Sequence, residues 1–535
     1  MTGRSRLSSP ALAAAVLAAG LVGAAGCAAR GPSAGTTAAL SKADALVRQG
    51  CYLCLQDAVS ILEEQATASP VPPVKVTARL LEARILEGLR QRELGIDSSQ
   101  AFARAGELAG GLGASRPGGP HGGGGGSAGF AGLDYTSLLD LAGLVSGDPI
   151  APVFGTRELP YPQWQARVKA SSAALGLAIP TSRLATYVAM SAACEDRQLR
   201  EALDAGAIAK AHPDTPLLTW RLATCTLGPD ESVAALAEQD PRWHEALWHL
   251  GRRQLATSRD VRRAAELFAR AAVGLPHAPA VLLSLAGAQQ ALRQLEPALA
   301  TYDRVLAITP TARPALLGRL ICLTHLGRHS DAVATATTMI ELGTFLIGDA
   351  RYWRAWNHYQ LGSLAAAEAD AEQALRLMSN TNAYTLAGVV KYDLKKLDEA
   401  EERLTRAREM DSANCQAVWY LGLVHTARPD WAAGASDFAT AVSCYTQAAA
   451  TARAELEALD QSIDPPETRA AARAEHEATI ESSELRASQS AYNAAHCLVR
   501  TGNRSRAINY LAIAAEHPGM KAQAERLRAS LPLPR

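Results

Sequence analysis

Residues 244–440 carry a recurring pattern of small and larger apolar positions, with a period of about 34 residues. One copy contains Leu250, Gly251, Ala264, Phe268, Ala271 and Pro276, and the next contains Leu282, Leu285, Ala286, Ala298, Tyr302 and Pro310. Alanine supplies many of the small positions; it is the strongest helix former, and its small side chain lets helix backbones approach one another. The pattern therefore predicts closely packed helices arranged as repeated units.

This pattern resembles the tetratricopeptide repeat, and a further copy near the C-terminus places Gly502, Ala507, Leu511 and Ala514 at the same offsets. The resemblance implies that each unit is two antiparallel helices, with alanine or glycine where the helices cross and larger apolar residues filling the gap to the next unit. One pair cannot bury its own apolar face, so neighbouring pairs must stack. We therefore expect an all-α, right-handed superhelical solenoid of stacked antiparallel helix pairs.

The pattern changes along the chain and divides it into segments. Weaker helical pairs, which we interpret as degenerate repeats, occupy residues 41–109. The glycine-rich residues 110–132 are predicted to be a flexible linker, because so much glycine holds neither helix nor strand. Residues 133–243 are a divergent helical region, which the repeat array at 244–440 follows.

The C-terminal segment, residues 441–535, is predicted to form an extended helical hairpin followed by one more repeat unit. The helices lengthen here and are interrupted at Asp464–Glu467, where the sequence reads DPPE. The heavily charged stretch that follows suggests an arm that projects beyond the array. Its charges fit a solvated face and, less commonly, a surface that docks a partner.

The first 26 residues have the layout of a secretory signal peptide, with basic residues, then an apolar run from Ala11 to Val22, then small residues. The sequence AAGC that closes this segment resembles the bacterial lipobox, whose cysteine is diacylated and becomes the mature N-terminus. The resemblance implies that Cys27 is lipidated. Ala24 departs from the leucine that the lipobox prefers, which leaves cleavage by an ordinary signal peptidase as the alternative.

Residues 27–40 are small and polar at first, which suits a flexible tether between a lipid anchor and a folded body. Position 28 is alanine rather than aspartate, which by resemblance to Gram-negative lipoproteins favours the outer membrane. The expected location is therefore outside the cytoplasm, on the outer membrane facing the periplasm.

Charge and motifs narrow the classes of function. The chain has 53 Lys and Arg and 53 Asp and Glu residues, and this balance argues against a dedicated nucleic-acid binder. It lacks the H-E-x-x-H, phosphate-loop and dinucleotide motifs. The GGSAG sequence around Ser127 matches the hydrolase nucleophile motif, but polyglycine does not supply the tight strand-to-helix turn that this motif needs. We expect no catalysis, no cofactor and no metal.

The sequence CYLC, from Cys51 to Cys54, is the strongest candidate for chemistry. A C-x-x-C at a helix start can be redox active, although the strand–helix context of thioredoxin is absent. The other interpretation is a local structural disulfide or two packed thiols. Two more disulfides are possible, Cys194 with Cys225 and Cys415 with Cys444, and the sequence alone does not decide the connectivity.

In tetratricopeptide repeats the first helix of each unit lines the inner, concave surface. Carried onto this sequence, the inner positions include Trp248, Tyr352, Trp356, Tyr359, Tyr392 and Trp419. Large amphipathic rings anchor peptides and other ligands, so these residues predict a groove for a partner; the alternative is that they pack as core.

Together these observations predict a membrane-anchored scaffold that binds other proteins at the bacterial cell envelope. Two alternatives stay open. The first is an envelope thiol-exchange accessory that uses Cys51 and Cys54. The second is a glycan-binding protein that uses the same aromatic residues on peptidoglycan.

Overall fold

The computed structural model describes residues 33–70, 72–114, 135–145, 161–174, 182–195, 200–201, 204–226, 230–343, 346–460 and 466–531. The signal peptide expected at residues 1–26, the lipidation expected at Cys27 and most of the glycine-rich linker lie outside these ranges. The described residues form α-helices with short connections and no strand, which confirms the all-α prediction. The chain divides into two compact units, an N-terminal unit (Met1–Arg259 and Glu266–Val281) and a C-terminal unit (Asp260–Ala265 and Leu282–Arg535).

The described helices of the N-terminal unit pack around a large apolar core and a smaller apolar cluster that contains Cys51 and Cys54. The helices of this unit are α2 (Ala34–Gln49), α3 (Tyr52–Thr67), α4 (Val74–Glu93), α5 (Ser99–Ala114), α6 (Tyr135–Leu144), α7 (Tyr161–Ala174), α8 (Arg183–Glu195), α10 (Ala205–Ala211), α11 (Pro216–Thr226), α12 (Asp230–Gln239) and α13 (His244–Thr257). Helix α4 lies at the centre: Leu80, Leu81, Ile85 and Leu86 are all buried in the core. Helix α14 (Val261–Gly274) spans the division between the two units.

Two segment boundaries differ from the sequence prediction. Helix α2 begins at Ala34, inside the tether expected at residues 27–40, because the Ser33 hydroxyl caps its first turn by accepting a hydrogen bond from Thr36 N at 3.1 Å. Helix α5 continues to Ala114, past the expected linker start at Gly110. Glycine in a helix costs only about 1 kcal/mol relative to alanine, so a helix already anchored by buried residues runs on through it.

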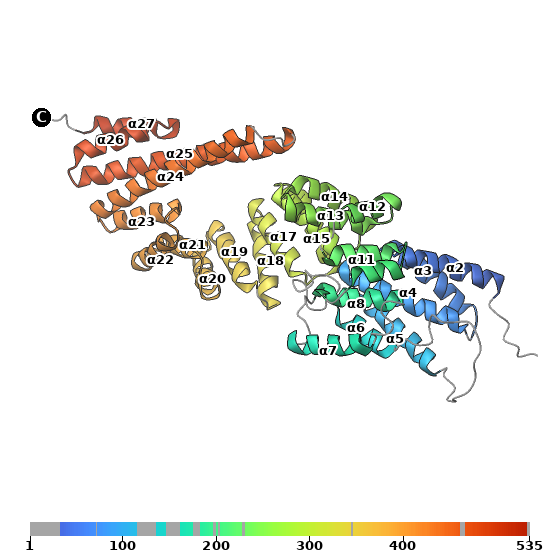
Figure 1. Ribbon diagram of the computed structural model, residues 1–535. Coiled ribbons are helices and arrows are strands. Elements are labelled where there is room, and N and C mark those ends of the chain that lie inside the picture. Colours follow the sequence, from blue (N-terminus) through green and yellow to red (C-terminus); the bar gives the residue numbers. More distant parts are fainter. Residues whose placement is uncertain are drawn as a thin grey trace, which may run out of the picture. The chain divides into compact units, whose positions relative to one another are not determined.

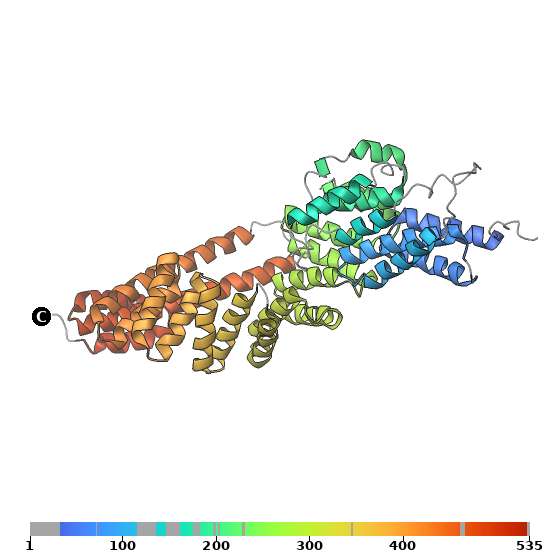
Figure 2. The same ribbon diagram turned by 90° about the horizontal axis from the view of Figure 1, so that it is seen from below.

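The C-terminal unit continues the chain as successive helix pairs (Figures 1 and 2). From α15, whose first residues belong to the N-terminal unit, the helices are α15 (Pro279–Ala291), α16 (Leu295–Ile308), α17 (Arg313–His325), α18 (His329–Glu341), α19 (Ile347–Gln360), α20 (Leu364–Leu377), α21 (Thr381–Asp393), α22 (Leu397–Met410), α23 (Cys415–Ala427), α24 (Trp431–Asp460), α25 (Pro466–Arg500), α26 (Arg504–Ala514) and α27 (Pro518–Ala529). From α16 onward each helix packs against the next one, and the buried apolar residues form successive clusters along the stack.

The turns between paired helices repeat the same backbone geometry. Arg293, Gly327, Gly362 and Lys395 each occupy the turn between two helices of a pair, with φ of 58°, 72°, 73° and 63°. These positions follow one another at about the 34-residue period seen in the sequence. A residue in the left-handed backbone conformation ends one helix, and it lets the chain reverse direction into the next helix.

Glycine and a large apolar residue meet where the helices of a pair cross. Gly388 of α21 faces Leu404 of α22, and Gly422 of α23 faces Phe438 of α24 in the next pair. A β-carbon at Gly422 would lie 2.8 Å from the Phe438 ring, so this position has no room for a side chain. The same small-to-large contact thus recurs in consecutive repeats and sets the close approach of their helices.

Helices α24 and α25 form a long hairpin, and we call this hairpin the arm (Figure 2). Because α24 begins at Trp431 and is continuous to Asp460, the expected boundary between residues 440 and 441 falls inside one helix. Ala449 and Ala452 are buried in this hairpin. Farther along the arm, Glu475 accepts a hydrogen bond from Arg293 Nη2 at 2.8 Å, which ties α25 to the turn after α15.

Candidate partner-binding site

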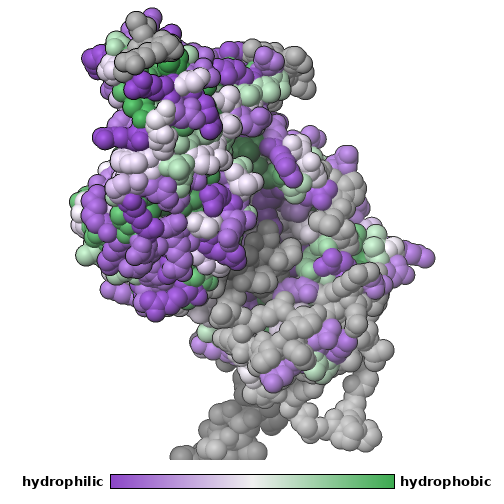
Figure 3. Space-filling model, turned by 90° about the vertical axis from the view of Figure 1, so that its left-hand side faces the viewer, coloured by the Kyte–Doolittle hydropathy of each residue, from purple (hydrophilic) through white to green (hydrophobic). Residues whose placement is uncertain are grey.

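Among the described residues, the face of the C-terminal end that Figure 3 draws has no broad apolar patch. Figure 3 shows that this end of the molecule is covered mainly by hydrophilic residues, with hydrophobic ones scattered among them. The large exposed apolar side chains of the C-terminal unit are spread over separate helix ends, as at Ile308, Leu361, Leu377 and Met410. Single exposed apolar residues are normal on a soluble surface. A binding site must therefore be sought in a local pocket.

One such pocket, which we call the aromatic pocket, has a volume of about 150 Å³ and is formed by the first helices of three successive repeats. Helix α19 contributes Tyr352, Trp356 and Tyr359, which project from one side of the helix because residues three and four apart share a face. The Trp356 and Tyr359 ring centroids lie 6.4 Å apart, and all three side chains are partly exposed. The structure thus brings together three of the six aromatic residues that the sequence predicts for the groove.

The hydroxyl of Tyr359 is fixed by a carboxylate. It donates a hydrogen bond to Asp393 Oδ2 at 2.9 Å. Burial, together with hydrogen bonds to Tyr420 and Asp393, raises the pKa of Tyr359 above its ordinary value, so the phenol stays protonated and keeps donating. The ring is therefore held in position against the pocket.

Helix α21, the turn after α22 and the start of α23 supply the remainder of the pocket wall. Leu386 and Val389 are its apolar members, and Asn382, Thr385, Asp411, Asn414 and Gln416 are its polar members. The Asn414 side chain caps α23 by accepting from Ala417 N at 3.0 Å, and its amide donates to Thr385 Oγ1 at 2.7 Å. These two polar groups are thus engaged with each other and with the fold, whereas the amides of Asn382 and Gln416 have no hydrogen-bond partner among the described residues.

The other three aromatic residues lie elsewhere. Tyr392 packs against Tyr420, with ring centroids 5.7 Å apart. Trp419 packs partly against the core of the last repeats, and the Arg486 guanidinium covers its ring at 5.0 Å. Trp248 belongs to the N-terminal unit and is only 6% exposed, so we correct its assignment from groove to interior. A predicted position on the inner face of a repeat therefore does not by itself distinguish a residue that lines the pocket from one that packs against other side chains.

The cysteines of C-x-x-C form a buried disulfide. Cys51 and Cys54 are bonded to each other and are both 0% exposed, beneath Trp220, Val233, Leu236 and Trp243. The Cys51 sulfur also caps α3, because it accepts from Cys54 N at 3.1 Å. Thiol exchange needs a partner thiolate to reach one of the two sulfurs. That approach is blocked unless this cluster opens, which disfavours the thiol-exchange alternative.

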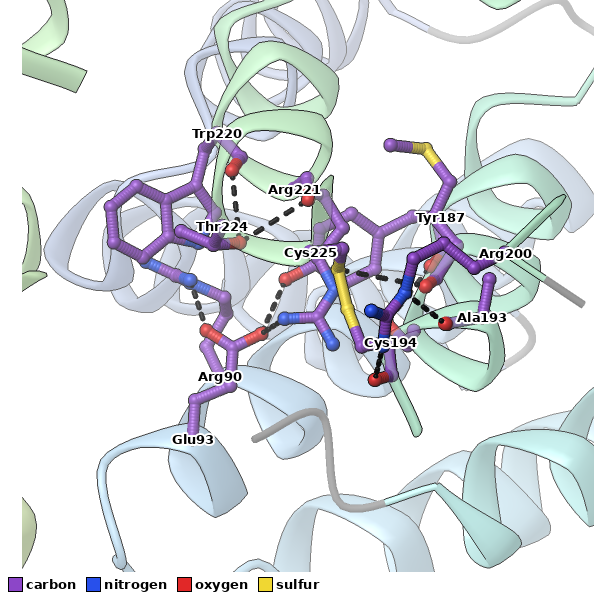
Figure 4. The surroundings of a disulfide bond; sticks show 12 residues. Arg90, Glu93, Tyr187, Ala193, Cys194, Arg200, Trp220, Arg221, Thr224 and Cys225 are labelled. Carbon is purple, nitrogen blue, oxygen red and sulfur yellow. Dashed lines mark hydrogen bonds and ion pairs between the residues drawn. A yellow bond between two sulfur atoms is a disulfide. The ribbon is translucent and has the colours of Figure 1, made fainter. Parts of the chain in front are cut away.

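Two further disulfides each join two different helices. Cys194–Cys225 links α8 to α11, and Cys415–Cys444 links the start of α23 to α24. Figure 4 shows that Cys194–Cys225 lies beside Arg221 and Arg200, with the Arg200 guanidinium directed at the carbonyls of Ala193 and Cys194. Both pairings were open possibilities in the sequence.

The remaining cysteines among the described residues, Cys322 and Cys497, are free and buried. Burial raises the pKa of both thiols to about 11, so neither is ionised at neutral pH. We expect iodoacetamide to leave both thiols unlabelled in the native protein at pH 8 and to label both after denaturation, as measured by mass spectrometry of each peptide. Rapid labelling of the native protein at either residue would contradict this.

A buried network of charges was missed in the sequence. Arg90 of α4 donates to Glu93 and to Glu245 of α13, and Glu93 also accepts from Arg221 at 2.8 Å and from Tyr187 at 2.9 Å (Figure 4 shows the part around Glu93). All five residues are buried. The signal available in the sequence was that charged residues are interspersed with apolar ones along α4. A surface helix would carry its charged residues on one face only.

Neither a metal centre nor a membrane span is evident in the part of the chain that the structure describes. Among those residues no three histidine, cysteine or carboxylate side chains are grouped so that they could hold a metal ion. No described helix combines the length and apolar character needed to cross a bilayer.

No protein-family model and no curated protein matches the chain. Among solved structures it is similar to the C-terminal part of a tetratricopeptide repeat protein from Cytophaga hutchinsonii, with 13% identity, coverage of 54% of this chain and 98% of that one, and a TM-score of 0.35. A tetratricopeptide repeat protein from Parabacteroides merdae has 17% identity, coverage of 54% and 97%, and a TM-score of 0.31. One from Thermus thermophilus has 22% identity, coverage of 32% and 94%, and a TM-score of 0.28. The helix pairs from α15 onward, with their recurring turns and their small-to-large crossings, form an all-α solenoid that is tetratricopeptide-repeat-like in fold.

Proposed function

We propose that this protein is a scaffold that captures a segment of a partner protein in the aromatic pocket, without catalysis of its own. The observation that carries the proposal is the pocket itself: three partly exposed aromatic rings of α19 stand beside amides of α21 and α23 that have no partner among the described residues. Aromatic anchors supply contact area at little cost in side-chain entropy, and such amides can pair with the backbone of an extended segment.

We further propose that lipid on Cys27 holds the array at the bacterial envelope, on the outer membrane facing the periplasm. The support is the layout of residues 1–28, with a signal-like start, a lipobox-like AAGC and alanine at position 28. The disulfides fit an oxidising compartment, where such bonds persist. Replacing Cys27→Ser should abolish incorporation of radiolabelled palmitate and release the chain from membranes; unchanged membrane attachment would overturn the anchor.

The pocket is tested by affinity capture from crosslinked, gently solubilised membranes with a Trp356→Ala variant. Loss of a central aromatic anchor typically costs about 2 kcal/mol or more, so we expect recovery of a discrete partner to fall by about 30-fold. The matched control is Leu361→Ala, because Leu361 is exposed at the end of the same helix and does not line the pocket. Equal recovery with both variants would remove the pocket from the mechanism.

Binding of purified peptidoglycan fragments separates the glycan alternative from the protein-binding proposal. Aromatic faces and amides can also pack on sugars, so the same Trp356→Ala variant serves both assays. Fragment binding that is lost in this variant, with no protein captured by either chain, would support the glycan function instead.

A further inference from the structure

We infer that the aromatic pocket selects a segment that carries an arginine or lysine side chain, an inference that rests on the proposed function of the pocket. Among the residues that line it, Asp411 is the one that carries a charge, and none is lysine, arginine or histidine. A ligand carboxylate would therefore meet a like charge without a cation to offset it. A cationic side chain would meet the opposite charge.

The Asp411 carboxylate is held in place and left available. Its Oδ1 accepts a hydrogen bond from Ala413 N at 2.9 Å, and its backbone N donates to Ala407 O at 3.0 Å, so the residue is fixed at the end of α22. The residue is exposed, and its carboxylate has no ion-pair partner among the described residues. The group is thus oriented by the fold, while its charge is not neutralised.

Several carboxylates elsewhere in the same repeats are paired with cations. Asp370 binds Arg351 at 2.9 Å and Arg354 at 2.6 Å, and Glu372 lies 3.1 Å from Lys391. Asp393, whose Oδ2 accepts from Tyr359 beside the pocket, likewise has no ion-pair partner in the described part of the chain. Arg351, Arg354 and Lys391 do not line the pocket and are engaged by other carboxylates, so they leave the negative charge at the pocket in place.

The remaining walls fit the other parts of a basic side chain. An arginine or lysine places an apolar stem below its charged group, and the partly exposed rings of Tyr352 and Trp356 supply apolar surface for such a stem beside the buried Leu386 and Val389. A guanidinium or ammonium is attracted to the faces of tryptophan and tyrosine, which Trp356 and Tyr352 provide. At about 150 Å³ the pocket is smaller than the usual small-molecule site of about 300–1,000 Å³, which suits one side chain of a longer segment.

The test starts with a random seven-residue peptide library, selected on the full chain without its signal sequence. A selected peptide is then synthesised with arginine, and again with citrulline, which has the same shape but no charge. We expect citrulline to weaken binding to the wild type by about tenfold or more, as for loss of a charge-assisted contact, and to weaken binding to Asp411→Asn by much less. The Glu341→Gln variant makes the same charge change at an exposed position that does not line the pocket, and it should behave as the wild type.

The outcomes distinguish this inference from the proposed function. Peptides that need Trp356 but contain no basic residue, or that tolerate citrulline, would overturn the charge selection and leave the pocket as a docking site. Peptides that bind Trp356→Ala as well as the wild type, or failure to select any peptide, would overturn both. Because citrulline alters only the ligand, the test holds even where Asp411→Asn disturbs the turn after α22.

Discussion

Replacing Glu245 with alanine is expected to destabilise the N-terminal unit by about 3–5 kcal/mol, the usual cost of breaking a buried ion pair by removing one partner. Arg90 is 0% exposed, and its guanidinium lies between Glu93, Glu245 and the ring of Trp220, 4.7 Å from the ring centroid. The same Glu245 carboxylate accepts from Tyr52 N at 2.7 Å. Its loss therefore leaves Arg90 with Glu93 alone, a carboxylate that Arg221 also uses, and leaves the buried amide of Tyr52 at the start of α3 without its acceptor.

Hydrogen exchange followed by mass spectrometry measures this effect locally, since it reports the free energy of opening of α4 and α13 separately from the other unit. The matched control is Glu409→Ala, which removes an exposed ion pair with Arg406 and should change stability by less than about 1 kcal/mol. A double Arg90→Met/Glu245→Met variant should recover part of the loss, because two apolar side chains leave no unpaired charge. Equal effects of Glu245→Ala and Glu409→Ala would contradict the assignment.

The second large effect is expected for Phe438→Ala, at about 3–5 kcal/mol, the usual range for truncating a buried phenylalanine. Phe438 is 1% exposed and fills the crossing of α23 and α24 against Gly422. Because Gly422 has no side chain, the neighbouring helix has no side-chain atoms there that could move in to fill the cavity. The loss should weaken the packing of the first turns of α24, at the base of the arm.

Thermal unfolding and hydrogen exchange of α23 and α24 measure this second change. Phe438→Leu serves as the control, since it keeps most of the apolar volume and should cost well under half as much. If Phe438→Ala and Phe438→Leu gave the same protection in α23 and α24, the close crossing at Gly422 would not be a determinant of stability.

The repeat architecture could be predicted because its physical cause is local and periodic. Gly422 and Phe438 recur at the positions of Gly388 and Leu404 in the preceding pair, so aligning the sequence with itself is enough to reveal the crossing. The linker boundary at Gly110 was placed too early, since glycine was given more weight as a helix breaker than it has in an anchored helix.

The pocket could be predicted only in part. Position on the first helix of a repeat pointed to Trp356 and also to Trp419, although Arg486 of α25, distant in sequence, covers the Trp419 ring. Contacts of this kind depend on how helices far apart in sequence come together, and no periodicity encodes them. The availability of Asp411 had the same origin, because it rests on which basic residues are paired elsewhere.

The arm has a mechanical consequence. In a stack of repeats with contacts only between neighbours, tension along the stack is shared among all the interfaces. The contact between Glu475 and Arg293 closes part of the C-terminal unit into a loop, so tension between α15 and the last repeats has a second path through α25. An exposed ion pair contributes at most about 1 kcal/mol and weakens with salt. This contact therefore adds stiffness at small loads, and the repeat interfaces carry the tension once it has opened.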